Sequence, residues 1–191
     1  MKLLRRNKAE KIRTREVTTE IVLFDENGKV RKLWRENFLG KFLRKNLGTT
    51  IRVSYITGVF VTVLRTHNLI TNVGHAGANG RMSNQGGYSP FIFLAIGTGT
   101  TAAAATDTAL QTEITTGGGA RASATASQVT TTVTNDTTQL VHTWTFTSSF
   151  AVTEEGILDA SSSGNLLAHQ VFSAVNVVSG DSLQITHRFS T

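Results

Sequence analysis

The chain of 191 residues contains no cysteine and only one proline. A disulfide framework, a thiolate metal site and a cysteine nucleophile are therefore excluded. Its apolar runs are short, and none approaches the roughly 18 residues that a membrane-spanning helix needs. The first residues lack the apolar segment of a secretory signal peptide, so we expect a protein made in the cytoplasm without membrane association.

Charge is also scarce, since Asp, Glu, Lys and Arg make up 17% of the residues and no lysine follows Lys45. Threonine is abundant instead, with 30 residues, and glycine contributes 17. A Thr-rich composition favours pleated strands over helices. The length and the 39% hydrophobic content suit one domain with a core, with or without an ordered extension.

The few charges are unevenly distributed along the chain. Residues 1–52 hold 15 Lys and Arg against 6 Asp and Glu, a balance of +9, whereas residues 53–191 hold 4 against 7, a balance of −3. A weakly charged body lacks the charges that normally discourage association. We therefore expect a protein that is built into an assembly, as a homo-oligomer or in many copies.

The N-terminal third reads as an arm followed by a docking extension. Residues 1–16 are rich in Lys, Arg and Glu and predict an extended or partly helical basic arm. Two β-prone runs then flank Asn27-Gly28, the strongest short-range signal for a hairpin. Apolar residues at helical spacing within 36–48 predict a short amphipathic helix that ends at Gly48. We assign residues 17–66 to this extension and 67–191 to the body.

The body reads as an antiparallel β-sandwich or jelly-roll-like barrel. Residues 50–70 predict strands broken near Thr57-Gly58, and the glycine-rich residues 71–89 predict a loop with at most one helical turn. After Pro90, β-prone runs alternate with turn clusters at the spacing of such folds. These runs are 91–97, 108–114, 122–134, 140–150, 155–160, 165–175 and 181–189.

The clearest two-residue period runs from Leu140 to Phe146, where Trp144 falls on the apolar face. Together with apolar residues of the later runs, this face predicts the centre of the sandwich core. The predicted core residues are Trp144, Phe146, Ile157, Leu167, Val171, Phe172, Leu183 and Ile185.

No motif in the chain points to an enzyme. The segment Gly97–Thr101 lacks the lysine and the helix of a phosphate-binding loop, so it predicts a strand-ending turn. Glu154 and Glu155 are adjacent, so in a strand they point to opposite faces and form no acid–base pair.

We expect no cofactor and no metal. The histidines show no metal-binding spacing and suit surface or strand-face positions, although one of them near a trimer axis would supply three ligands; they are His67, His75, His142, His169 and His187.

Five segments of the body, in this order, resemble a module of tailed-phage virion proteins that include tail-fibre, tail and head-associated components. They are Asn68–Gly74, Ala95–Glu113, Glu154–Ala160, Gly164–Phe172 and Gly180–Thr186. The resemblance covers about two thirds of the chain. It implies a virion location, synthesis in the host cytoplasm, and neither cofactor nor catalytic residues.

Composition and resemblance together predict a non-enzymatic structural subunit at the capsid surface, the head-to-tail region or the tail. We expect it to dock on acidic capsid, neck or tail proteins through its N-terminal third. The predicted docking residues are Arg5, Arg6, Arg13, Arg15, Phe38, Phe42 and Leu43. Two alternatives stay open. One is a receptor- or glycan-binding module with Tyr55 and Tyr88 as ligand-facing aromatics; the other is a packaging factor whose arm contacts nucleic acid.

Overall fold

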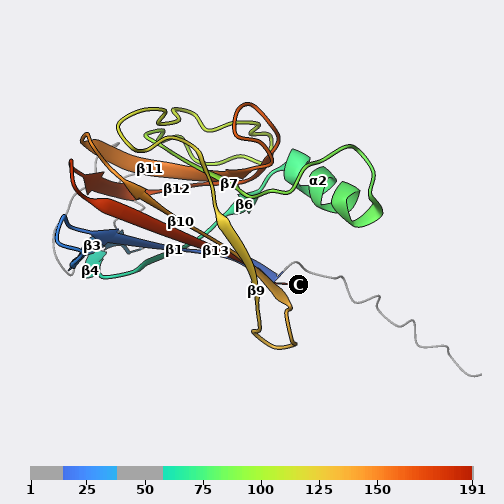
Figure 1. Ribbon diagram of the computed structural model, residues 1–191, viewed down its shortest axis with the longest axis horizontal. Helices are drawn as coiled ribbons and strands as arrows, with labels where there is room; N and C mark the ends of the chain where they lie inside the picture. The colour runs from blue at the N-terminus through green and yellow to red at the C-terminus, as the bar shows by residue number, and fades with distance from the viewer. Residues whose placement is uncertain (1–14, 38–57, 191) are drawn as a thin grey trace, which may run out of the picture.

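Two antiparallel sheets lie face to face in the residues that this computed structural model describes, 15–37 and 58–190. Figure 1 shows β7, β11 and β12 in one layer and β1, β10 and β13 in the other. The architecture is the predicted β-sandwich. No helix in the described ranges is long and apolar enough to cross a membrane.

The larger sheet has the strand order β2-β1-β13-β10-β9, and β5 also pairs with β1. Its strands are β1 (Arg15–Phe24), β2 (Val30–Arg31), β5 (Leu64–His67), β9 (Thr125–Val129), β10 (Thr137–Thr145) and β13 (Ser182–Ser190). The second sheet has the order β6-β12-β11-β7-β8. Its strands are β6 (Leu69–Ile70), β7 (Phe93–Gly97), β8 (Ala122–Ser123), β11 (Phe150–Leu158) and β12 (Leu166–Val177). β3 (Leu33–Glu36) and β4 (Gly58–Val61) form a separate pair.

The predicted hairpin around Asn27-Gly28 is confirmed as β1 and β2. The Asp25 carboxylate accepts hydrogen bonds from the N–H groups of Asn27 at 3.0 Å and Lys29 at 2.9 Å. Gly28 has a φ of 75°, a conformation that glycine adopts without a steric penalty. β1 comes from the segment that we assigned to an extension, yet it pairs with β13 over its whole length and buries Ile21 and Leu23 in the core.

The core contains six of the eight residues that the pattern predicted. Trp144 is 2% exposed, and its indole N–H donates to the carbonyl of Ala120 at 2.8 Å. Leu167 is half-buried and packs against the core, whereas Val171 is half-buried beside a surface pocket. Val171 departs from the prediction because it pairs with Glu154 and so lies on the face of its sheet that is turned away from the larger sheet.

The prediction of a loop for residues 71–89 was wrong, because α2 spans Asn72–Ser83. The Thr71 hydroxyl caps this helix by accepting from the N–H of Gly74 at 2.9 Å. Gly74 and Gly77 are buried, and a β-carbon at Gly74 would collide with the backbone of Leu167. These glycines therefore allow close helix–sheet packing, a role that composition alone does not distinguish from a loop.

A strand was also predicted for residues 108–114, and this prediction was wrong. Only a single β-bridge joins Glu113 to Gly97. The N–H groups of Gln111 and Thr112 donate to a buried carboxylate instead of to a neighbouring strand. The predicted helix within 36–48 and the strand before Thr57 lie outside the described residues, apart from the first two helix positions.

We predict that Trp144→Ala lowers the free energy of unfolding by about 4 kcal/mol, because it leaves a large cavity and removes the bond to Ala120. Urea titration of the folded chain measures this change. Thr143→Ala, on the exposed face of the same strand, is the matched control and is expected to cost about 0.5 kcal/mol or less. A loss under about 1 kcal/mol for the tryptophan variant would contradict its place in the core.

Candidate functional site

Glu154 lies completely buried on β11 and faces the segment that follows β7. Its Oε1 accepts hydrogen bonds from the N–H of Gly99 at 2.9 Å and of Thr112 at 2.7 Å. Its Oε2 accepts from the N–H of Gln111 at 2.9 Å and lies 3.1 Å from Nε2 of His169. Burial raises the pKa of Glu154, but the hydrogen bonds from His169 and the backbone outweigh it and lower the pKa to about 2.

His169 links this carboxylate to a second one. Its Nδ1 lies 2.8 Å from Oδ2 of Asp107, which also accepts from the N–H of Ala104 at 2.8 Å. Burial lowers the pKa of His169, but the hydrogen bonds to Glu154 and Asp107 outweigh it and raise the pKa above its ordinary value. Both ring nitrogens are occupied by carboxylates, so neither is available as a general base for a bound substrate.

Glu155 points to the opposite side, into the space between the two sheets, as the alternation predicted. Its Oε1 accepts from the side-chain amides of Asn68 at 2.8 Å and Gln170 at 2.6 Å. Its Oε2 lies 2.7 Å from Nε2 of His187, a fully buried residue of β13. This cluster joins β11, β12, β13 and the residue between β5 and β6.

Hydrogen bonds of Asn68 extend this cluster to β1. The Asn68 side-chain amide donates to Glu155, and its amide oxygen accepts from the hydroxyl of Thr19. The Thr19 oxygen also lies 3.0 Å from Nδ1 of His187. Through Thr19, Asn68 and Glu155, the cluster therefore ties β1 to the opposite sheet.

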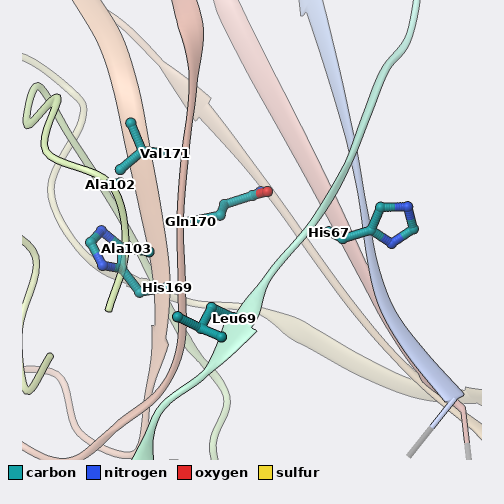
Figure 2. Close-up of a pocket in the computed structure, with 7 residues that line it drawn as sticks. All are labelled: His67, Leu69, Ala102, Ala103, His169, Gln170 and Val171. Carbon is teal, nitrogen blue, oxygen red and sulfur yellow. The ribbon is translucent and has the colours of Figure 1, made fainter. Parts of the chain in front are cut away.

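A surface pocket with a volume of about 190 Å³ opens beside these clusters, where β12 meets the chain around β6. Figure 2 shows its lining side chains on β12, on the strand that carries Leu69, and on the loop after β7. The lining residues are His67, Leu69, Ala102, Ala103, His169, Gln170 and Val171. His169 is already bound by carboxylates, and Ala102 and Ala103 offer no polar side chain.

Sequence reasoning missed these two buried clusters. It placed the glutamates on opposite faces, but no local spacing links Glu154 to Asp107 and His169, which lie 47 and 15 residues away. Two of the five histidines are strand-face residues with no exposed surface, His169 and His187. Within the described ranges, no group of three or more His, Asp or Glu side chains is arranged to hold a metal ion.

The predicted docking residues fall mostly outside the described ranges, as do Tyr55 and all of residues 1–14. Arg15 is the first described residue and opens β1. Tyr88 is half-buried, with its ring tilted against Phe91 at a centroid distance of 6.4 Å and close to Gly80 and Gly86. The structure thus gives Tyr88 a packing contact beside α2.

Residues 71–188 match the model of a protein family described as Podophage GP4 fiber I protein gp80. No curated protein and no solved structure matches the chain. The matched region begins at the cap of α2 and includes Glu154 and Glu155. It excludes β1, although β1 is an inner strand of the larger sheet.

We predict that stability is highest between about pH 4.5 and pH 6.5. The lowered pKa of Glu154 stabilises the fold above its ordinary value of 4.5, and this contribution is lost as the pH falls toward 2. The raised pKa of His169 stabilises the fold below its ordinary value of 6.5, and this contribution is lost as the pH rises through the folded-state value. Thermal unfolding measured below, within and above this pH range detects both losses of stability.

Glu154→Gln is expected to reduce the loss of stability at low pH. It is also expected to lower the free energy of unfolding by about 3 kcal/mol near pH 6, because its amide group would face backbone N–H donors. Glu113→Gln, at the more exposed ion pair with Arg121, serves as the control. If Glu154→Gln lost stability at low pH as strongly as the unchanged protein does, other groups would be responsible for this loss.

Proposed function

The chain belongs to the family of podophage GP4 fiber I proteins. We propose that it joins the particle through the end of the sandwich at which β1 begins. Membership makes it a structural protein of a phage virion that associates with other virion proteins. The attachment route and the absence of catalysis are our proposals. The clusters around Glu154 and Glu155 support a structural role, since their polar atoms bind one another.

The position of Arg15 carries the attachment proposal. Arg15 pairs with Ser190, Ser190 with Thr137, and Thr137 with Val129, so these four residues form one row across the larger sheet. β1 begins at this row with Arg15, and the loop 130–136 begins at it as well. The start of β1 and a projecting loop therefore share one end of the sandwich (Figure 1).

The charges of the body support an acidic partner. Its carboxylates are mostly engaged within the fold: Glu154, Glu155, Asp159 and Asp181 are buried. Glu20 pairs with Arg65 and Arg188, and Glu113 pairs with Arg121. Glu26, in the turn at the opposite end, is exposed. Asp136, in the loop 130–136, is partly exposed but accepts hydrogen bonds from three backbone N–H groups of its own loop. The arm therefore has little acidic surface on its own body, and an acidic neighbour would neutralise it.

Charge alone gives weak attachment, because exposed ion pairs are screened by salt. We propose that Phe38, Phe42 and Leu43 add apolar contact to the charges of Arg5, Arg6, Arg13 and Arg15. A glycan-binding role through Tyr55 and Tyr88, and contact of the arm with nucleic acid, remain the alternative proposals. The geometry favours docking, since the described Tyr88 ring packs against its own chain.

We predict that replacing Arg5, Arg6 and Arg13 with glutamate blocks incorporation into particles while the body stays folded, because arm and core are separate in the chain. Particles assembled with the variant are purified, and the subunit is quantified by mass spectrometry. Circular dichroism of the free variant confirms the β-rich body.

The matched control replaces Lys29, Lys32 and Arg35, which lie in and after the turn at the opposite end of β1, with glutamate. It changes the net charge equally. Incorporation that falls equally in both variants would indicate an effect of net charge, and normal incorporation of the arm variant at moderate salt would contradict the proposal.

A further inference from the structure

β9 is an open edge of the larger sheet. It pairs with β10 on one side, and no other strand in the described ranges pairs with its second side. Four of its five residues are exposed, Thr125 to Gln128. Figure 1 shows the β9–β10 hairpin reaching beyond the body of the sandwich. Its outer row of backbone N–H and C=O groups is therefore accessible to another chain.

This edge lacks the sequence features that normally prevent an edge strand from pairing with another chain. Residues 122–135 contain no Asp, Glu, Lys, Arg or proline. The opposite edge of the same sheet carries Arg31 on β2 and Arg65 on β5, with Lys29 and Lys32 beside them. In the second sheet, the edge strands β6 and β8 have only two residues each. Among the described edges of the two larger sheets, β9 is thus the one that neither charge nor shortness protects.

The hairpin is also held in a defined shape. The Asp136 carboxylate accepts from the N–H groups of Thr131 at 2.8 Å, Thr132 at 2.8 Å and Val133 at 2.9 Å. These hydrogen bonds hold the pKa of Asp136 well below its usual range, and the bond from the N–H of Val133 contributes most. Val133 nevertheless stays 66% exposed at the tip. A fixed, exposed hairpin loses little conformational entropy when a partner binds.

We propose that the β9 edges of two copies of this chain pair with each other, antiparallel across a twofold axis near Ser127. Such a contact places the same short segment of both copies side by side, with Ser127 opposite Ser127, so an edge with a net charge would repel itself. The uncharged β9 edge meets this condition, and the β2–β5 edge with its arginines does not. The contact goes beyond the proposed attachment to the particle and does not depend on it.

The antiparallel arrangement also separates the points at which β1 begins in the two copies. Arg15 lies in the row that contains Val129, the last residue of β9. Two antiparallel β9 strands place these rows at opposite ends of the paired segment, so the two Arg15 positions lie apart. A five-residue pairing is short, so we expect weak association in solution that strengthens when copies are held together on a particle.

The chain has no cysteine, so single-cysteine variants test this geometry without background. Residues opposite each other in antiparallel strands have Cα atoms about 4.5 to 5.5 Å apart, within the range that a disulfide bridges. Ser127→Cys is therefore expected to form a disulfide-linked dimer under mild oxidation about tenfold faster than Thr138→Cys. Thr138 is the matched control, because it is exposed on β10 of the same hairpin but has strands on both sides.

Sedimentation of the full chain over a range of concentrations provides an independent measurement. Wild type is expected to associate more at high concentration, Ser127→Lys to abolish this, and Thr138→Lys to retain it. Circular dichroism verifies that each variant is folded. Equal disulfide rates at both positions, or no association of wild type, would overturn the proposal. So would cross-linking of Ser127→Cys to a different virion protein in particles without self-linked dimer.

Discussion

The fold depends on how two adjacent buried carboxylates on β11 are neutralised. Glu154 and Glu155 have no exposed surface, and an unpaired carboxylate at such a position would cost several kcal/mol. Each is therefore matched by a buried histidine and by N–H donors. Because the two side chains point in opposite directions, Glu154 fastens the segment after β7, and Glu155 fastens the opposite sheet through His187.

This constraint explains why a protein with so few charges buries several of them. The polar atoms of the interior are used to join segments far apart in sequence, in a chain that has no disulfides. The uncharged, threonine-rich exterior and the basic N-terminal arm are the parts that we propose for contacts with other subunits. In this proposal the body keeps its shape while its edges and arm meet neighbours.

The sequence predicted the sandwich, the hairpin at Gly28 and the anchor Trp144, because each follows from a local period or a turn motif. It did not predict α2, whose glycines are read locally as breakers and in the fold as sites of close packing against Leu167. The Glu154 cluster could not be predicted from the sequence either, because its partners come from separate strands and loops. The place of β1 as an inner strand follows from its pairing with β13, which no local pattern specifies.

Native-state hydrogen exchange tests most directly whether the Glu155 cluster makes β1 part of one cooperative body. The hydroxyl of Thr19 on β1 is bound to Asn68 and His187 of that cluster. We expect the amides of Thr18 to Phe24 to exchange with the same opening free energy as their partners on β13. Exchange of β1 through a much smaller opening, while β10 and β13 stay protected, would contradict this expectation.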